Sequence, residues 1–317
     1  MMRAALAWVP PRLLSRTAAL PRECCPTVDE GLRGAALLLE RAGVDTARLD
    51  AECLLAQALG TTRWELTLRR ERRLPSEAFA RFLTLLQRRE RREPLAFLTG
   101  TREFWSLALA VTPGVLVPRP ETETLVEATL TAVRQRPESY RRDGVLLDLG
   151  TGTGAVAIAL ARELPGVRLL ATDVSRRALR VARCNAEAHG VAGRIRFLRG
   201  DLWRALEGAV PAGALDAVVA NPPYIPSAAI AGLMPEVQWE PRVALDGGAD
   251  GLALHRQILE GAPRYLRPAG LVLLEIGADQ GSGAAALFEA SGAFEAPTVI
   301  RDLAGRDRVV MARRTGC

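Results

Sequence analysis

The chain has 317 residues, 49% of them apolar, and a formal net charge of +6. At about 100–200 residues per domain, this length predicts two domains with buried cores. No apolar run reaches the roughly 18–20 residues that span a bilayer, so no membrane partner is expected. The sequence contains no lysine, which excludes chemistry that depends on a catalytic lysine. The charge is too modest to predict stable nucleic-acid binding. The five cysteines and two histidines lack the spacing of zinc ligands, so no metal site is expected.

The N-terminal residues differ in composition from the rest of the chain. Residues 1–22 carry four arginines among Leu, Ala, Ser and Thr, and the first acidic residue is Glu23. Such a basic, acid-free stretch is typical of a mitochondrial transit peptide, whereas Pro10-Pro11 interrupts the apolar run that a secretory signal needs. Residues 1–26 are therefore predicted to be a transit peptide that directs the protein to the mitochondrial matrix. An ordinary N-terminal tail is the alternative.

Residues 27–93 predict a small helical bundle. Thr27-Val28-Asp29-Glu30 has the pattern of a capping box, which starts a helix that Gly43 ends. A second helix is expected between Asp45 and Gly60, and a third is expected to be capped by Ser76. We expect this bundle to form a separate domain that docks the substrate.

Two arginine clusters lie within this bundle, at residues 69–73 and 88–92. Runs of like charge most often form a solvated face, and we interpret both clusters in this way. A docking surface for an acidic partner or RNA is the less favoured interpretation.

Residues 94–120 predict a linker that contains a β-hairpin. The apolar segments 104–111 and 115–117 flank Thr112-Pro113-Gly114, which has the composition of a turn. A helix is expected to follow over 121–134.

Residues 121–317 predict an α/β domain, because strand-like and helix-like segments alternate after Gly144. This rhythm is typical of a parallel, doubly wound sheet of the Rossmann-like type. Two final strands are expected to add an antiparallel hairpin at the sheet edge. The expected strands are 145–149, 167–171, 195–198, 215–220, 271–276, 298–301 and 308–312, and the expected helices are 155–163, 175–190 and 251–266.

A glycine-rich motif, Asp148-Leu149-Gly150-Thr151-Gly152-Thr153-Gly154, follows the first of these strands. Glycines let a backbone turn tightly and approach a ligand closely. The motif also satisfies a loose dinucleotide fingerprint, so an NAD-dependent oxidoreductase remains an alternative. The acid before the glycines suits an amino-acid ammonium group better than a pyrophosphate.

Two further acids follow the next two strands. Asp173 can accept hydrogen bonds from both ribose hydroxyls of a nucleoside, although a helix cap would also use an acid there. Asp201, in Gly200-Asp201-Leu202-Trp203, can accept from an adenine amino group; a turn followed by a core tryptophan is the alternative.

The motif Asn221-Pro222-Pro223-Tyr224 follows the fourth strand, at the sheet edge where ligands of such folds bind. Its two prolines fix the backbone and lack N–H donors. The Asn221 side-chain oxygen and the Pro222 carbonyl can therefore accept from a substrate NH₂ group, while Tyr224 stacks on a flat amide or base. Holding both hydrogens aims the nitrogen at a methyl donor, and no strong base is needed. A rigid Pro-Pro turn is the structural alternative.

With these motifs in this order, the chain resembles the HemK/PrmC family of peptide-chain release factor glutamine N5-methyltransferases from about residue 27 onward. Asn-Pro-Pro-Tyr alone is shared with DNA enzymes that methylate amino groups, whereas Pro118-Arg119-Pro120-Glu121-Thr122-Glu123 is far more specific to this family. The segments Pro94-Leu95-Ala96-Phe97-Leu98-Thr99-Gly100 and Ala244-Leu245-Asp246-Gly247-Gly248-Ala249-Asp250-Gly251-Leu252 also match.

The resemblance implies a class I methyltransferase sheet and methylation of the glutamine in the Gly-Gly-Gln motif of class I release factors, here the mitochondrial ones. It implies S-adenosylmethionine as cofactor and substrate contacts by Asn221, Pro222, Pro223 and Tyr224, with Asn221, Pro222 and Tyr224 as catalytic residues. The position after Asp201 is aromatic in some members of the family and is Leu202 here. The implied cofactor-binding residues are Gly150, Thr151, Gly152, Thr153, Gly154, Asp173, Asp201 and Asn221.

Two alternatives remain besides NAD chemistry. The first is a DNA or RNA amino-methyltransferase, which would need a base-flipping pocket and a basic recognition stripe. The second is a non-catalytic scaffold, although all the motif residues are intact.

Overall fold

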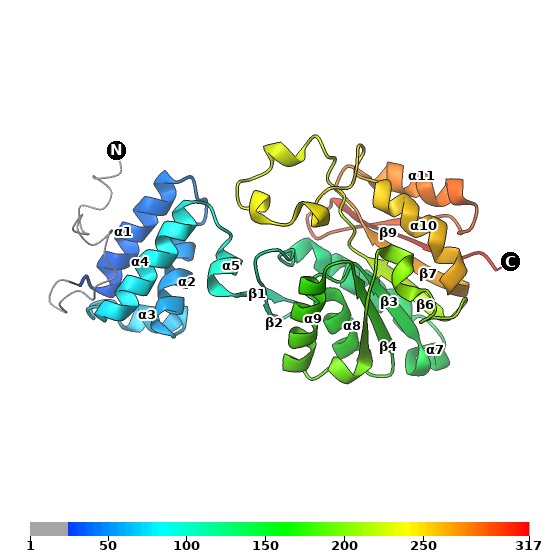
Figure 1. Cartoon of the computed structure of the whole chain (residues 1–317), viewed down its shortest axis with the longest axis horizontal. Helices are drawn as coiled ribbons and strands as arrows, with labels where there is room; N and C mark the ends of the chain where they lie inside the picture. The colour runs from blue at the N-terminus through cyan, green and yellow to red at the C-terminus, as the bar shows by residue number, and fades with distance from the viewer. Residues whose placement is uncertain (1–24, 317) are drawn as a thin grey trace. The chain divides into compact units, whose positions relative to one another are not determined.

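The computed structural model describes residues 25–316, and the chain divides into two compact units (Figure 1). The first unit comprises the chain up to Gly100 together with Pro235–Trp239; the second comprises Thr101–Met234 and the chain from Glu240 onward. This division differs from the predicted one in two places, because 94–100 and 235–239 belong to the helical unit. The predicted transit peptide lies outside the described residues, apart from Cys25 and Pro26.

The helices of the first unit begin and end largely where their capping signals lie. Thr27 and Glu30 form the predicted capping box, with Thr27 N donating to Glu30 Oε2 at 2.8 Å and Glu30 N to Thr27 Oγ1 at 3.2 Å. Ser76 does not cap its helix as predicted, because Pro75 occupies that position and Ser76 is the first helical residue. Two short helices were not predicted, α3 and α5. The helices are α1 (Val28–Arg41), α2 (Ala47–Leu59), α3 (Arg63–Leu68), α4 (Ser76–Glu90) and α5 (Leu95–Thr99).

The first unit has its own apolar core, formed by the inward faces of its helices. The apolar residues of α1, α2 and α4 recur at helical spacing, so each helix presents one apolar face. These faces pack together in one apolar cluster. The largest fully buried side chains of this core are Leu39, Leu54, Leu55, Leu66, Leu74, Phe79, Phe82 and Leu86.

The arginine cluster 88–92 is not the solvated face that we expected. Arg89 is 5% exposed; its Nε donates to Asp50 Oδ2 at 2.7 Å, and its Nη2 lies 2.8 Å from Glu236 Oε1. Arg92 forms a two-pronged pair with the same Glu236, at 2.6 and 2.7 Å. Because a charge leaves water only when it is paired, these carboxylates explain the burial of Arg89. The pairs also hold segment 235–239 in the helical unit.

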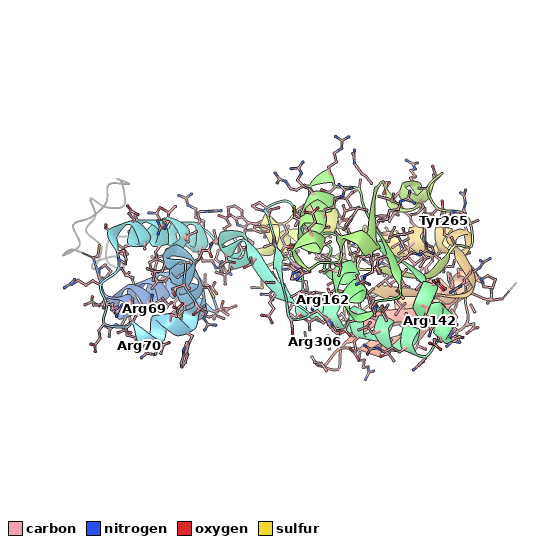
Figure 2. The ribbon with its side chains drawn as sticks, turned by 90° about the horizontal axis from the view of Figure 1, so that it is seen from below. Arg69, Arg70, Arg142, Arg162, Tyr265 and Arg306 are labelled. Carbon is pink, nitrogen blue, oxygen red and sulfur yellow. The ribbon has the colours of Figure 1, made fainter. Side chains whose placement is uncertain are left out.

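The cluster 69–73 follows α3 and is exposed, as expected for a solvated face. Arg69 pairs with Glu65 one helical turn earlier, with Nη2 3.2 Å from Oε1. Figure 2 shows the side chains of Arg69 and Arg70 on this unit. Exposed pairs of this kind contribute about 0–1 kcal/mol, so the cluster does not determine the fold.

The second unit is built on a seven-stranded sheet with the strand order β5-β4-β3-β6-β7-β9-β8. The first five strands in this order run parallel, and β9 and β8 complete the sheet with antiparallel pairing. The predicted α/β class and the antiparallel edge hairpin are therefore confirmed. The strands are β3 (Val145–Leu149), β4 (Arg168–Asp173), β5 (Ile195–Arg199), β6 (Leu215–Ala220), β7 (Leu266–Glu275), β8 (Thr298–Arg301) and β9 (Asp307–Arg313).

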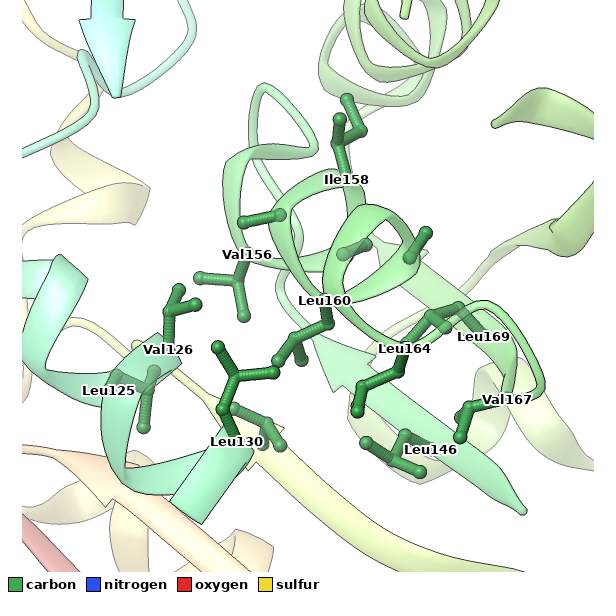
Figure 3. Packing of buried hydrophobic residues seen from close by; sticks show 14 of the residues in the cluster. Leu125, Val126, Leu130, Leu146, Val156, Ile158, Leu160, Leu164, Val167 and Leu169 are labelled. Carbon is green, nitrogen blue, oxygen red and sulfur yellow. The ribbon is translucent and has the colours of Figure 1, made fainter. Parts of the chain in front are cut away.

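Helices cover both faces of this sheet. Successive strand residues point to opposite faces, so Leu146 contributes to the core under α6 and α8, whereas Leu147 contributes to the core under α10 and α11. Figure 3 shows Val126 and Leu130 of α6 facing Leu160 of α8 in the first of these cores. The helices are α6 (Glu123–Arg134), α7 (Glu138–Asp143), α8 (Ala155–Glu163), α9 (Arg176–Ala188), α10 (Ala253–Tyr265) and α11 (Gly281–Ser291).

The β-hairpin lies within the predicted region, but its turn was placed wrongly. Strands β1 (Thr101–Phe104) and β2 (Leu107–Ala110) pair across Trp105 and Ser106, not across residues 112–114. Both turn residues have positive φ, 53° and 56°, which is the conformation that matches the twist of a two-residue hairpin. Glu123 Oε1 accepts from Trp105 N at 2.8 Å and so supports this turn without a glycine.

The buried ion pairs of the helical unit lead to a stability prediction. Asp50→Ala would leave the Arg89 guanidinium buried without its nearer carboxylate, so we expect a loss of about 3–5 kcal/mol in the free energy of unfolding. Glu40→Ala, at an exposed position on α1, is the control and is expected to change it by less than about 0.5 kcal/mol. Chemical denaturation measures both, and equal values would contradict the role of the Asp50–Arg89 pair.

Candidate functional site

A cavity of about 250 Å³ opens in the second unit, where the parallel strands end. Its wall brings together the motifs that follow β3, β4, β5 and β6, which lie far apart in the sequence. A ligand site at the carboxyl edge of such a sheet is expected from the fold. The predicted site residues in the wall are Gly150, Thr151, Gly152, Thr153, Asp173, Asp201, Asn221, Pro222 and Pro223.

The glycine loop takes a shape that glycines alone adopt easily. Gly150, Gly152 and Gly154 have φ of 81°, 56° and 84°, and Gly154 begins α8. A Cβ added at Gly154 would lie 3.1 Å from Ala182 Cβ, so this glycine allows close helix packing. A Cβ at Gly150 or Gly152 would meet no atom within 4 Å, so these positions face open space. Gly150 and Gly152 thus leave space for a ligand in the cavity, whereas Gly154 allows α8 to pack closely against Ala182.

Asp148 lies beneath this loop and helps to shape it. The side chain is 2% exposed, and its Oδ2 accepts from Thr151 Oγ1 at 2.6 Å and from Ala157 N at 3.2 Å. Burial raises the pKa of the Asp148 carboxyl to about 6, against the lowering effect of these two donors. Asp148 also lines the cavity, so a ligand cation there would favour its ionised form.

Asp173 ends β4 and is fixed by backbone donors. Its Oδ2 accepts from Gly152 N at 2.9 Å and its Oδ1 from Ser175 N at 2.8 Å. Ser175, not Asp173, caps α9, because Ser175 Oγ accepts from Ala178 N. Each carboxylate oxygen keeps a further lone pair for a donor in the cavity. This geometry suits the pair of ribose hydroxyls that the sequence suggested.

The segment after β5 contributes two residues to the cavity wall and one residue that packs against the core. Asp201 and Leu202 line the cavity, and Leu202 has a φ of 43°. Trp203 packs elsewhere: its ring stacks on Tyr265 with centroids 5.4 Å apart, and its Nε1 donates to the Gln257 carbonyl at 3.0 Å. The apolar neighbour of Asp201 in the cavity is therefore Leu202, and Trp203 is half-buried and packs against the core.

The Asn221 side chain is oriented by a contact that the sequence did not reveal. Its Nδ2 donates to the Thr122 hydroxyl at 3.1 Å, and Thr122 itself is 4% exposed. The Oδ1 atom is then left to accept from a substrate N–H. Asn221, Pro222 and Pro223 all line the cavity, as predicted for the acceptor side.

Tyr224 and Glu275 lie together beside this motif. The Tyr224 hydroxyl is 3.5 Å from Glu275 Oε1, and Glu275 is fully buried at the end of β7. Burial raises the pKa of Tyr224 to about 12, and it raises the pKa of Glu275 to about 7, where hydrogen bonding to Thr122 opposes the rise. The sequence predicted a role for Tyr224 in the site but none for Glu275.

Three contacts fix the Pro118–Glu123 segment, and one of them joins it to the site residue Asn221. Arg119 Nη2 lies 2.6 Å from the buried Glu240, whose other oxygen accepts from Val117 N at 3.3 Å. Thr122 holds Asn221, and Glu123 holds the hairpin turn. The sequence predicted this segment only from the family resemblance. In the structure, its Arg119, Thr122 and Glu123 side chains each make a specific polar contact.

The Ala244–Leu252 segment packs against the residues that follow Asn221-Pro222-Pro223-Tyr224. Ile225 N donates to the Leu245 carbonyl at 3.1 Å, and Gly247 N donates to the Ile225 carbonyl at 2.8 Å. A Cβ added at Gly251 would lie 2.3 Å from the Tyr224 carbonyl oxygen. This glycine is therefore required for the close approach of two backbones.

Three residues of this arrangement were missed from sequence: Thr122, Glu240 and Glu275. Thr122 lies in a segment to which the sequence assigned no role. Glu240 follows an irregular loop, whose sequence has no apolar periodicity from which its position could be predicted. Glu275 did carry one signal, since a carboxyl at the end of an apolar strand is costly to bury. A buried acid at a strand end beside a ligand edge is a candidate for a site role.

The residues present fit S-adenosylmethionine. Gly150 and Gly152 face open space, Asp173 offers oriented acceptors for ribose, and Asp201 with Leu202 offers an acceptor beside an apolar surface. Asp148 places a buried carboxyl in the cavity wall, and a ligand ammonium group there would keep it ionised. Among residues 25–316, no group of three or more His, Cys, Asp or Glu side chains is placed to hold a metal ion. No helix within that range is long and apolar enough to cross a membrane.

The close approach at Gly251 can be tested by substitution. Gly251→Ala adds the steric overlap with Tyr224, whereas Gly190→Ala shares the positive φ, 71° against 77°, but meets no atom within 4 Å. Gly190→Ala should lose about 1–2 kcal/mol of stability because of the backbone strain, and Gly251→Ala should lose more because of the overlap. We expect only Gly251→Ala to speed amide hydrogen exchange at Ile225 and Gly247, by about tenfold or more. Equal exchange in the two variants would argue against this role of Gly251.

Comparison with known proteins gives matches across both units. The PrmC N-terminal domain family matches residues 30–100, and the Methyltransferase small domain family matches residues 125–234. Among solved structures, the N-terminal domain of human METTL16 in complex with SAH has a TM-score of 0.47 and 18% identity, covering 67% of this chain and 77% of that one. The ribosomal protein L11 methylase of Lactobacillus delbrueckii subsp. bulgaricus has a TM-score of 0.46 and 20% identity, covering 65% and 84%.

Two relatives match nearly the whole chain. The release factor glutamine methyltransferase of Moorella thermoacetica is 47% identical over 289 residues, which cover 91% of this chain and 99% of that protein. The release factor glutamine methyltransferase of Cereibacter sphaeroides is 46% identical over 285 residues, covering 90% and 97%. With the site geometry and matches of this extent, the chain belongs to the HemK/PrmC family of S-adenosylmethionine-dependent release factor glutamine methyltransferases.

Proposed function

We propose that this protein methylates the side-chain amide nitrogen (N5) of the glutamine in the Gly-Gly-Gln motif of class I peptide-chain release factors, and that it is the mitochondrial form. The acceptor is proposed from the names of the relatives, which are release factor glutamine methyltransferases. The observation that carries the chemistry is the Asn221 amide, whose nitrogen is held by Thr122 at the wall of the cavity.

An amide nitrogen is a weak nucleophile because its lone pair is delocalised into the carbonyl group. The Asn221 Oδ1 atom and the Pro222 carbonyl oxygen are two acceptors at one motif, and together they hold both hydrogens of a substrate NH₂. The lone pair is then directed along a fixed line, which removes much of the entropic cost of transfer. When bound, S-adenosylmethionine would supply an electrophilic methyl group; the sulfur would keep the electrons of the broken carbon–sulfur bond, and the methylated nitrogen would release one proton.

The cavity wall explains how two substrates are brought together. Gly150 to Thr153, Asp173 and Asp201 would hold the cofactor, and Asn221 to Pro223 the acceptor, so the two sets meet where β3 and β6 lie side by side. The Tyr224 phenol keeps its proton at neutral pH, since its pKa is raised to about 12. Tyr224 therefore takes no part in proton transfer, and it lies outside the described cavity wall.

Mass spectrometry of a release factor incubated with the protein and S-adenosylmethionine tests this proposal. We expect the mass of one methyl group to be added at the Gly-Gly-Gln glutamine and no transfer to duplex DNA or RNA. Transfer to nucleic acid alone would replace the proposal with an amino-methyltransferase acting on bases. Release factors from mitochondria and from bacteria, tested in parallel, measure the preference for the mitochondrial form.

Replacement of Asn221 tests the chemistry in the same assay. Asn221→Ala removes one of the two acceptors for the substrate NH₂, so turnover should fall by about 100-fold or more. Cofactor affinity, measured by calorimetry, should stay within about threefold of wild type, because most proposed cofactor contacts lie elsewhere. Glu187→Ala, at an exposed position on α9, is the control and should behave as wild type. Unchanged turnover in Asn221→Ala would contradict the assigned role.

The mitochondrial location is supported by the composition of residues 1–22, which contain Arg3, Arg12, Arg16 and Arg22 and no acid. The full chain with a C-terminal fluorescent tag should co-localise with a matrix marker. Replacing the four arginines with glutamate should abolish import, because it reverses the charge that transit peptides need. Matrix import of the glutamate variant, or a diffuse signal from the wild-type chain, would count against this location.

A further inference from the structure

Gln280 joins three segments of the second unit through a single side chain. It directly precedes α11 and is half-buried. Its Nε2 atom donates to the Tyr224 carbonyl oxygen at 2.9 Å and to the Asp250 carbonyl oxygen at 3.4 Å. Its Oε1 atom accepts from Gly277 N at 2.8 Å, in the turn between β7 and α11. Both ends of one amide group are therefore used, and the donor end holds the last residue of the motif Asn221-Pro222-Pro223-Tyr224.

The start of α11 does not explain why the Gln280 side chain lies there. Gln280 is the N-cap residue of α11, yet its side chain makes no capping hydrogen bond to the helix. The side chain packs instead against Gly251, where an added Cβ would lie 2.4 Å from Gln280 Nε2 and 2.3 Å from the Tyr224 carbonyl oxygen. The contact between Gln280 and Tyr224 is thus enclosed by a close approach of two backbones.

The partners of the Gln280 amide fix its direction. A backbone N–H only donates and a backbone carbonyl only accepts, so the amide oxygen must face Gly277 and the NH₂ group must face Tyr224. A flipped amide would place donor against donor and acceptor against acceptor. A carboxylate at this position could still accept from Gly277 N, but it could not donate to the Tyr224 carbonyl. The arrangement therefore needs a side chain with both a donor and an acceptor.

The motif that Gln280 holds is stiff, so contacts at its two ends determine the direction of the groups between them. Each proline ring fixes φ at about −65°, and a residue that precedes a proline is restricted as well. Pro222 and Pro223 also have no N–H through which the backbone could be held. The Asn221 side chain is held by Thr122 at one end, and the Tyr224 carbonyl is held by Gln280 at the other.

We propose that Gln280 is a positioning residue for methyl transfer: by holding the Tyr224 carbonyl, it fixes the direction of the Pro222 carbonyl oxygen, one of the two acceptors for the substrate NH₂. The proposal rests on the proposed function, since it concerns the same acceptor site. Gln280 is absent from the described cavity wall, so it acts through the backbone of the motif and does not touch the substrate.

Isotope labelling makes the Tyr224 carbonyl observable by itself in the full-length protein. The sequence contains three tyrosines, and only Tyr224 is followed by an isoleucine. Labelling with ¹³C-carbonyl tyrosine and ¹⁵N-isoleucine should therefore give a single Tyr224–Ile225 signal in an HNCO spectrum, which correlates an amide with the preceding carbonyl. Loss of the hydrogen bond to the carbonyl oxygen should shift the carbon signal upfield.

Two variants separate the Tyr224 contact from the turn before α11. Gln280→Leu removes the contacts with both Tyr224 and Gly277. Gln280→Glu keeps the size of the side chain and the acceptor for Gly277 N but removes the NH₂ group. Amide hydrogen exchange at Gly277 reports on the turn. Gln257→Glu, at an exposed position on α10, is the matched control for the added charge.

The spectra are recorded without acceptor substrate at about pH 8, so that the introduced carboxyl group is ionised. We expect the Tyr224 carbonyl signal to shift upfield in both Gln280 variants and to stay in place in Gln257→Glu. Exchange at Gly277 should become about tenfold or more faster in Gln280→Leu and stay unchanged in Gln280→Glu. Because no acceptor is present, these results do not depend on which substrate is methylated. An unmoved Tyr224 signal in Gln280→Leu would contradict the contact.

Kinetics test the consequence for transfer, using the release factor or whichever acceptor the assay identifies. Both Gln280 variants should lower kcat by about 10- to 100-fold, with the dissociation constant for S-adenosylmethionine within about twofold of wild type. A role confined to the turn before α11 predicts instead that Gln280→Glu keeps the wild-type kcat. That result, or a wild-type kcat in Gln280→Leu, would overturn the proposal. If Gln280→Leu does not fold, Gln280→Ala takes its place.

Discussion

The parallel direction of β3, β4, β5, β6 and β7 is the constraint on which the site depends. Because these strands run the same way, their carboxyl ends meet at one edge, and the residues that follow them lie together there. In spatial order the edge carries Asp201, Asp173, the glycine loop, Asn221 and Glu275, although their order in the chain is different. After β3 the chain adds β4 and β5 on one side of β3, and it then returns to place β6 on the other side of β3. The two proposed substrate halves therefore meet between β3 and β6, and Glu275 lies beside Asn221 because β7 pairs with β6.

Much of the fold could be predicted because its signals are local. The strands β3 and β6 are short apolar runs between glycines and polar residues, and their observed limits equal the expected ones. Helix α8 likewise begins directly after its glycine loop. Helix α1 begins at a capping box in which the Thr27 and Glu30 side chains each accept from the other residue's backbone N–H. Site residues were found where a motif follows a strand, since topology then fixes the side of the sheet. Asp173, Asn221 and the glycine loop all reach one cavity for that reason.

The features that could not be predicted depend on contacts between distant residues. The hairpin turn was expected at Pro113-Gly114, because turn composition is a local signal, yet Glu123 supports a turn at Trp105 and Ser106 instead. The arginines at 88–92 were expected in water because their carboxylate partners, Asp50 and Glu236, lie far away in sequence. Thr122, Glu240 and Glu275 each contact residues that lie far away in the sequence. Pairings of this kind have no period and no spacing, so a single sequence does not reveal them.

The helical unit is assembled from two separate pieces of chain, and this has a consequence for engineering and for evolutionary exchange. Its continuous part ends at Gly100, and Pro235–Trp239 complete it from within the loop that joins Tyr224 to Glu240. A chimera that exchanges only the first hundred residues with a relative would keep Glu236 of this chain but replace its partners Arg89 and Arg92 with the relative's residues. The unit that can be transplanted intact is therefore discontinuous, and recombination at a single crossover cannot deliver it. The helical segment that ends at Gly100 and the segment Pro235–Trp239 should consequently be inherited together.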